Sequence, residues 1–317
     1  MRRVALVYNP ASGQIFNRSG SVIDEVLAVV RGAGVEAETI ATTAPGSAAD
    51  QVRQAVERGC DTILACGGDG TVHEVMQSLV GRQTALGVIP LGTANALAAD
   101  LGLPISPVKA AQVLLSAVPV RIPVGHIFYR DREDVESSRY FTVAAGVGAD
   151  AHLMYRMDAK LKRQFGYALY AVEGLRVLAT HGFPPFDVEF TEVGRSKPRV
   201  EVVSQLLAVR IRNFGGMIQN LAPGATLRND NLRLVAFKTR NRFDFVRFMA
   251  AVVFRRQTFK GKIEILDSVR VECRAHKHSK AQVFVEADGE LLGGLPARIE
   301  IVPDALTLLV PERTQRS

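Results

Sequence analysis

Apolar and polar residues follow two different patterns along the chain. Up to about residue 120, short apolar runs of strand length alternate with segments of helical spacing. The predicted strands are 2–8, 35–41, 60–66 and 84–90, and the predicted helices are 21–34, 48–59 and 71–81. Continuous apolar strands between helices indicate a parallel sheet covered on both faces.

Beyond residue 120 the pattern is that of an antiparallel β protein. The predicted strands are 120–129, 139–148, 186–193, 199–213, 231–239, 262–275, 281–290 and 297–303, and two helical stretches lie at about 151–164 and 167–180. So many strands with few helices between them favour a sandwich or barrel. We therefore expect an α/β domain over 1–122 and an all-β antiparallel sandwich domain over 123–303, with the tail, 304–317, as a segment that could return to the first domain.

Charge and cysteine content narrow the class of protein. The net charge of +7 favours an anionic partner: a nucleotide, a nucleic acid or a membrane surface. The three cysteines are not spaced like metal ligands, which is typical of a reduced, cytoplasmic protein. The longest wholly apolar run, 248–254, is far shorter than the roughly 20 residues of a membrane span, so we expect none.

A glycine-rich loop, GGDGT, lies between a predicted strand and a predicted helix. The backbone can approach phosphate oxygens closely at its three glycines, Gly67, Gly68 and Gly70. The helix that follows offers free N–H groups and a positive dipole end. Thr71 can cap this helix or contact phosphate, and Asp69 can hold Mg²⁺ or orient a hydroxyl. The ordinary alternative is a tight turn in which Asp69 is only a cap.

Two more polar loops follow strands of the same predicted sheet. NPASG places Asn9, Ser12 and Gly13 after the first strand, and PLGTANALA places Gly92, Thr93 and Asn95 after the fourth. A parallel sheet brings such strand ends to one edge, where ligands bind. Three unrelated surface turns are the alternative. The chain lacks a Walker-type G-x-x-x-x-G-K-[ST] run and a G-x-G-x-x-G after the first strand.

These loops make the chain similar to the diacylglycerol kinase catalytic family, the lipid kinases that include diacylglycerol, phosphatidylglycerol, sphingosine and ceramide kinases. The matching stretches run in order from about residue 4 to 302: VYNPASG, GGDGTVHEV, LGVIPLGTANALAADLGLP, NFGGMIQNLAPGATLRNDNLRLVAF and VFVEADGELL. GGDGT alone is shared with NAD kinases. GGDGT followed by PLGTAN and a late DGE is specific to the family.

The resemblance implies an ATP-binding domain like that of NAD kinase and phosphofructokinase, a β-sandwich that carries the lipid, and an active site in the cleft between them. Its nucleotide contacts fall on Asn9, Ser12, Gly13, Thr42, Gly67, Gly68, Asp69, Gly70, Thr71, Thr93 and Asn95. Thr43 is the alternative to Thr42.

The resemblance also implies the general base. The acid of the late DGE segment, Glu290, takes the lipid hydroxyl's proton in this family, whereas sphingosine kinases assign that role to the acid matching Asp69. The residues themselves predict a strand, a turn and a strand here, which would place Asp288 and Glu290 at an exposed corner. A plain Asp-Gly hairpin turn is the alternative.

Bacterial members of the family carry a structural Mg²⁺ held by one Asp and two backbone carbonyls. The resemblance assigns these ligands to Asp230 and to the carbonyls of Leu227 and Leu232. The chain departs from the family's Asp-Gly here, because Asn231 stands in place of the glycine. Asn tolerates positive φ better than most residues, so the turn can persist.

A basic stretch, 238–262, contains eight basic residues and one acid. Its apolar residues at helical spacing are Phe245, Phe248, Met249, Val252 and Val253. Such a helix is typical of a membrane-surface element, and a helix docked on the sandwich is the alternative. We expect no nucleic-acid partner.

We therefore expect an ATP- and Mg²⁺-dependent lipid kinase, cytoplasmic or peripheral at the inner face of the membrane, that phosphorylates a hydroxyl of diacylglycerol or a related lipid. Two alternatives stay open: an NAD kinase-like enzyme with a soluble substrate, and a catalytically silent lipid-binding protein. A homodimer is kept as an option.

Overall fold

The fold was analysed in a computed structural model, which describes residues 1–10, 21–44, 46–156, 176, 178–216, 218–254, 261–279 and 281–312. The chain forms two compact units, a first unit of Met1–Ile122 with Asp304–Ser317 and a second unit of Pro123–Pro303. The chain leaves the first unit within β5 (Val118–Arg130) and returns to it within β14 (Glu290–Val310).

The first unit is built on a parallel sheet, as expected. Its strands are β1 (Arg3–Tyr8), β2 (Glu36–Ala41), β3 (Thr62–Gly67) and β4 (Ala85–Pro90). They lie in the order β2-β1-β3-β4, and the end of β14 adds a further parallel strand beside β4 through Thr307 and Leu308. Every residue of β3 and β4 is buried, which explains why their sequences are continuous apolar runs.

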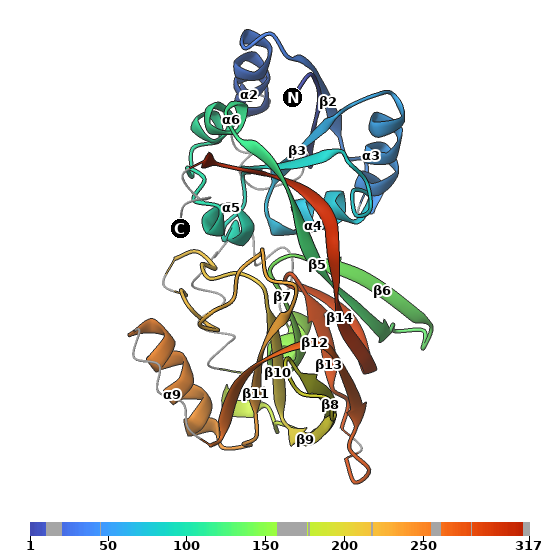
Figure 1. The fold of residues 1–317 in the computed structure, drawn as a ribbon, viewed down its shortest axis with the longest axis vertical. Helices are drawn as coiled ribbons and strands as arrows, with labels where there is room; N and C mark the ends of the chain where they lie inside the picture. Colours follow the sequence, from blue (N-terminus) through green and yellow to red (C-terminus); the bar gives the residue numbers. More distant parts are fainter. Residues whose placement is uncertain are drawn as a thin grey trace. The chain divides into compact units, whose positions relative to one another are not determined.

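Helices cover both faces of this sheet. They are α2 (Ser21–Gly32), α3 (Ser47–Glu57), α4 (Asp69–Gln77), α5 (Ala96–Asp100) and α6 (Pro107–Leu115). Helix α2 packs with α6 and α3 packs with α4, and Figure 1 shows the two pairs on opposite sides of the sheet. Helix α6 begins where the Ser106 hydroxyl accepts a bond from the Lys109 N–H and proline occupies the first helical turn.

The second unit is antiparallel. Besides β5 and β14 its strands are β6 (Glu136–Phe141), β7 (Ala144–Gly148), β8 (Phe186–Glu192), β9 (Arg199–Val203), β10 (Gln205–Val209), β11 (Leu232–Phe237), β12 (Ile263–Ala275) and β13 (Phe284–Ala287). The order is β14-β13-β7-β10-β11-β12-β8-β9, and β14 also pairs with β12. Because β14 pairs on both sides, the sheet closes around a core that includes Phe141, Phe186 and Ile299.

Two of the expected strands are each two strands. Residues 139–148 divide into β6 and β7 because the Thr142 and Val143 N–H groups donate to the Asp288 carboxylate instead of to a neighbouring strand. Residues 199–213 contain β9 and β10, which have different partners. The break falls at Ser204, whose N–H donates to the Phe237 carbonyl and whose hydroxyl donates to the Thr239 carbonyl.

The described helices of the second unit are α7 (Ala149–Arg156) and α9 (Arg242–Val253). Most of the predicted helical stretches 151–164 and 167–180 lies outside the described residues. Helix α9 starts where the Asn241 side chain accepts the Phe243 N–H, and it docks on the unit through Phe245, Phe248 and Val252. No helix in the described part of the chain has the length and apolar character needed to cross a membrane.

Candidate active site

The carboxyl ends of the parallel strands are level with one another in the first unit. Tyr8, the last residue of β1, lies opposite Ala41 of β2 and Cys66 of β3. Gly67 lies opposite Pro90 at the end of β4. The segments that follow these strands therefore meet at one edge of the sheet. They supply the expected nucleotide contacts Asn9, Thr42, Gly67, Gly68, Asp69, Gly70, Thr71, Thr93 and Asn95; Ser12 and Gly13 lie outside the described residues.

The backbones of the loops after β3 and β4 touch. A side chain on Gly92 would overlap the Gly68 Cα, and one on Gly68 would lie 3.1 Å from the Gly92 Cα. The Leu91 N–H donates to the Gly67 carbonyl at 2.9 Å. Only glycine allows this approach at Gly92, and a side chain at Gly68 would be tight, so the packing of the two loops itself favours both glycines.

Asp69 connects these two loops. Its Oδ2 accepts the Asn95 N–H at 3.0 Å and its Oδ1 accepts the Ala96 N–H at 2.7 Å, at the start of α5. Asn95 has a left-handed backbone, with φ of 49°, and its side chain bonds both the N–H and the carbonyl of Gly92 at 2.8 Å. Asp69 thus caps α5, the helix after β4. It does not cap α4, the helix that begins at Asp69 itself.

The start of α4 offers unsatisfied donors. The N–H groups of Gly70 and Thr71 have no acceptor among the described residues, and the positive end of the α4 dipole lies at the same place. Thr71 packs its side chain back against Gly67, where a Cβ would overlap it. This arrangement suits the oxygens of a phosphate group.

In the second unit, the expected hairpin forms between β13 and β14. Its turn residues, Asp288 and Gly289, have φ of 48° and 81°. Glu290 is exposed, as expected, and its carboxylate makes no bond to a described residue. The expectation was wrong for Asp288, which is buried at 9% exposure.

Asp288 is buried because its carboxylate anchors the turn to another segment. It accepts N–H groups from Thr142 at 3.0 Å, Val143 at 2.8 Å and Ala144 at 3.1 Å. The Gly289 N–H donates to Glu286 at 2.9 Å. Glu290 therefore follows a turn that is fixed from two sides, and the sequence signal for a plain Asp-Gly turn did not reveal this anchor.

A second buried carboxylate, Asp150, lies at the start of α7. Its Oδ1 accepts bonds from the Gln205 amide at 2.5 Å and from the Ala151 N–H at 2.8 Å. Its Oδ2 is buried, has no hydrogen-bond partner among the described residues, and lies directly over Gly146, where a Cβ would overlap it. Burial raises the pKa of Asp150 to about 6, against the lowering effect of the Gln205 bond.

The expected structural metal ligands, Leu227, Asp230 and Leu232, lie in the segment that leads into β11 and at the start of that strand. The Leu227 carbonyl accepts a bond from the Arg210 guanidinium at 2.9 Å, and Asp230 is exposed. Among the described residues, no group of three or more His, Cys, Asp or Glu side chains is arranged to hold a metal ion. Cys60, Cys66 and Cys273 are buried and form no disulfide.

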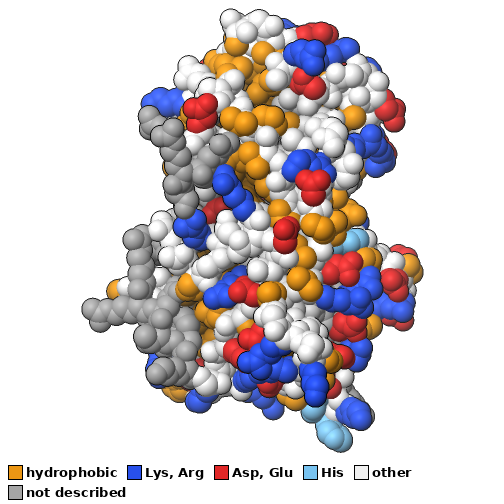
Figure 2. Space-filling model, viewed as in Figure 1, with side chains coloured by type: hydrophobic (Ala, Val, Ile, Leu, Met, Phe, Trp, Pro, Cys, Tyr) orange, Lys and Arg blue, Asp and Glu red, His pale blue; other side chains and the backbone are white. Residues whose placement is uncertain are grey.

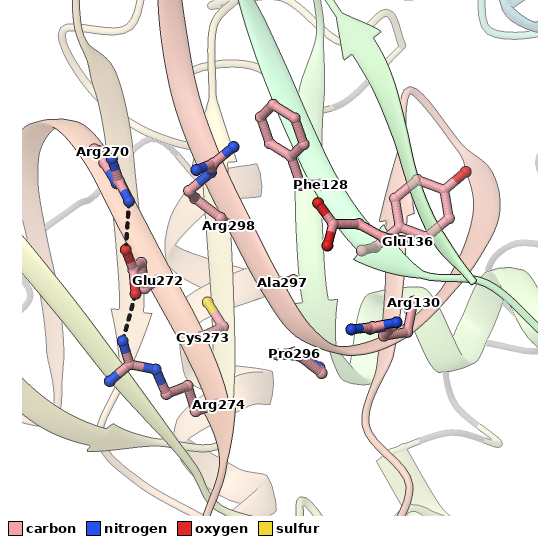
Figure 3. A pocket seen from close by; sticks show the side chains of 11 residues that line it. Phe128, Arg130, Glu136, Arg270, Glu272, Cys273, Arg274, Pro296, Ala297 and Arg298 are labelled. Carbon is pink, nitrogen blue, oxygen red and sulfur yellow. Dashed lines mark hydrogen bonds and ion pairs between the residues drawn. The ribbon is translucent and has the colours of Figure 1, made fainter. Parts of the chain in front are cut away.

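A depression of about 230 Å³ on the second unit is rich in arginine. Figure 3 shows Glu272 bonded to both Arg270 and Arg274, and Arg298 stacks over the Phe128 ring with 3.9 Å from Cζ to the centroid. Figure 2 shows charges of both signs interspersed over this part of the surface. The carboxylates therefore neutralise much of the positive charge of the arginines in this depression.

Comparison with known proteins identifies the family. The model of the diacylglycerol kinase catalytic domain matches residues 3–127, and that of the YegS C-terminal NAD kinase beta sandwich-like domain matches 142–310. A diacylglycerol kinase of Bacillus subtilis is 31% identical over 300 residues, covering 93% of this chain and 92% of its own. The chain belongs to the diacylglycerol kinase family.

Other similarities agree with this assignment. A protein named "Probable lipid kinase YegS-like" from Chromohalobacter salexigens is 28% identical over 97% of this chain and 93% of its own. The crystal structure of a diacylglycerol kinase from Bacillus anthracis covers 99% of this chain and 98% of its own, with a TM-score of 0.71 at 18% identity. A yeast NADH kinase solved with NADH covers 98% of this chain and 83% of its own at 10% identity, and its TM-score of 0.53 supports the NAD kinase-like fold alone.

The buried carboxylate of Asp150 makes the stability of this protein depend on pH in a way that can be tested. Its pKa in the folded state, about 6, lies above the unfolded value near 4, so the stabilisation is complete at low pH and is lost as the pH rises through 6. Asp150→Asn removes this titration. The free energy of unfolding of the variant minus that of the wild type should therefore increase between pH 4.5 and 7.5, by on the order of 1–3 kcal/mol.

Urea unfolding at several pH values measures this difference. Titrating groups that do not interact with Asp150 are common to both proteins and cancel in the comparison. A difference that stays constant over this pH range would show that Asp150 has an ordinary pKa.

Proposed function

We propose that this protein is an ATP-dependent lipid kinase that transfers the γ-phosphate of Mg-ATP to a hydroxyl of diacylglycerol or a related lipid. The observation that carries the proposal is the meeting of the GGDGT and PLGTAN loops at the strand ends, in backbone contact and with unsatisfied N–H groups. Its family membership supports the same reaction class.

On the nucleotide side, the residues of the chain position and neutralise phosphate. The N–H groups of Gly70 and Thr71 would bond phosphate oxygens, and Thr93, which is exposed after β4, would add a hydroxyl. Asp69 holds the two loops together and would be the carboxylate of these loops that holds the nucleotide's Mg²⁺. That ion, when bound, neutralises charge that develops on the transferred group.

On the acceptor side, Glu290 is the stronger candidate for the general base. Both oxygens of Asp69 already accept backbone N–H groups, whereas the carboxylate of Glu290 is exposed and makes no bond to a described residue. The anchored turn at Asp288 limits the positions that Glu290 can take. A base placed in this way contributes roughly 10²–10⁴-fold to the rate.

The second candidate function is a kinase with a soluble acceptor, as in NAD kinases. The only support for it is the likeness of the fold to that of an NADH kinase. The surface of α9 favours a lipid. Phe243 and Phe254 are 80% and 73% exposed, and Val246, Met249 and Val253 are also exposed on the same helix. We name this set the outer stripe of α9.

The outer stripe differs from the apolar face expected from the sequence. Phe245, Phe248 and Val252 are buried in the core of the second unit, whereas Met249 and Val253 are exposed. One face of α9 therefore docks on the second unit, and the other face stays apolar and solvent-exposed, which supports the membrane-surface alternative. Arg242 and Arg247 are exposed on the same helix, so the outer stripe suits an anionic bilayer surface.

The outer stripe gives a direct test of membrane contact. Phe243→Ser combined with Phe254→Ser should weaken binding to phosphatidylglycerol-containing vesicles by at least about tenfold, because each exposed ring contributes roughly 1 kcal/mol or more when it enters the bilayer. Vesicle sedimentation measures the binding. A matched control is Val200→Ser with Val202→Ser, which removes exposed apolar residues from β9. Equal loss in both double variants would contradict a specific role of α9.

The reaction itself is tested by ADP release from Mg-ATP in mixed micelles. The acceptor panel is diacylglycerol, phosphatidylglycerol, sphingosine, ceramide and NAD. We expect turnover with a lipid and a loss of at least about 100-fold in kcat for Glu290→Gln, because the amide cannot accept the proton. Turnover with NAD alone would overturn the lipid assignment, and ATP binding without turnover of any acceptor would favour a silent lipid-binding protein.

A further inference from the structure

Arg210 is a cation in the interior of the second unit. It directly follows β10, and at 1% exposure it is among the largest fully buried side chains of the described residues. A buried charge is costly unless its donors are satisfied. The partners of Arg210 therefore indicate what the charge does there.

The guanidinium of Arg210 donates to four backbone carbonyls and to no carboxylate among the described residues. Nη1 donates to Asn229 at 2.7 Å and Asn231 at 2.8 Å, and Nη2 donates to Pro123 at 2.8 Å and Leu227 at 2.9 Å. Three of these carbonyls belong to the segment that leads into β11. A set of inward-pointing carbonyl oxygens is also the kind of site that binds a hard metal cation.

This segment is the one in which the family resemblance implies a structural Mg²⁺. The Leu227 carbonyl, one of the implied ligands, is already bonded to Arg210. Asp230, the implied carboxylate ligand, is exposed and makes no hydrogen bond or ion pair to a described residue, and its negative charge acts on Arg210 through space. A divalent ion bound to the Leu227 carbonyl would be repelled by the guanidinium at close range. The residues present do not fit the metal.

We propose that the guanidinium of Arg210 takes the place of a structural divalent cation in the second unit. Its planar set of donors satisfies carbonyls that would otherwise face one another without a partner. It ties β5, the end of β10 and the segment before β11 together through one side chain. The protein then needs no metal to order this segment.

A second arginine holds the same segment from the other side. The Arg233 Nε donates to the Pro223 carbonyl at 2.8 Å, and Arg233 pairs with Asp267 of β12 at 2.7 Å. Residues 223–231 contain no helix or strand, so these arginine bonds replace the pairing that a strand would provide.

The proposal is tested first on the wild-type protein without nucleotide, so that its outcome does not depend on the kinase activity. The Tm should be the same in EDTA as in millimolar MgCl₂, and elemental analysis after gel filtration should find no stoichiometric divalent metal. A fall in Tm in EDTA that Mg²⁺ reverses, or one bound divalent ion per chain, would overturn the proposal.

Two substitutions separate the guanidinium from the implied metal ligand. Arg210→Met leaves buried carbonyls unsatisfied and should lower the Tm by roughly 5–10 °C, in EDTA and in MgCl₂ alike. Asp230→Asn should change the Tm by less than about 2 °C, because Asp230 is exposed. Arg228→Met, which removes an exposed arginine from the same segment, is the matched control.

The Asp230 variant decides the question even if Arg210→Met does not fold. A large loss of stability in Asp230→Asn, or retention of wild-type stability in Arg210→Met, would show that a metal and not the guanidinium orders the segment.

Discussion

The contact between the backbones of Gly68 and Gly92 is the constraint on which the nucleotide side of this protein depends. It brings the ends of β3 and β4 together, leaves no room for a side chain at Gly92 and leaves only a tight space at Gly68. The side chains of Asp69 and Asn95 then form hydrogen bonds with backbone groups of the loop after β4. As a result the unsatisfied N–H groups of α4 are held rigidly, which is the condition for binding phosphate without reorganisation.

In the second unit, buried charged side chains hold irregular segments in place. The Asp288 carboxylate accepts N–H groups where β6 ends and β7 begins, and the Arg210 guanidinium donates to carbonyls before β11. In both places the chain has left a strand, so its backbone groups have no neighbouring strand to pair with. A charged side chain satisfies several of them at once and so ties the irregular segment to the sheet.

The period of the apolar pattern predicted the fold well, because strands and helices bury their residues with different spacings. The parallel sheet, the antiparallel second unit and the β13–β14 hairpin all follow from it. Anchors such as Asp288 and Arg210 could not be predicted in this way. Their partners lie far away in the sequence, so nothing in the neighbouring residues distinguishes Asp288 from the exposed first residue of an Asp-Gly turn.

The functional residues, too, could be predicted only where neighbouring residues in the sequence carry the signal. Glycine loops at strand ends predicted a phosphate site, since each loop follows its own strand, and that site stays a prediction. The apolar residues expected at helical spacing on α9 do not share one environment: Phe245, Phe248 and Val252 are buried, whereas Met249 and Val253 are exposed. Spacing alone does not decide which residues face the core, and the packing of Phe237 against Phe245 shows which face of α9 docks. The structure of the described residues thus corrected the face and kept the helix.

The central claim is that the touching loops after β3 and β4 form the ATP-phosphate site. Calorimetric titration of Mg-ATP into the wild type and into Gly92→Ala tests it most directly, with Gly32→Ala as the control, since a Cβ at Gly32 would meet nothing within 4 Å. The account predicts one ATP bound per chain in the wild type and the control, and affinity at least about tenfold weaker in Gly92→Ala, because the methyl group separates the loops. Unchanged affinity in Gly92→Ala would contradict the account.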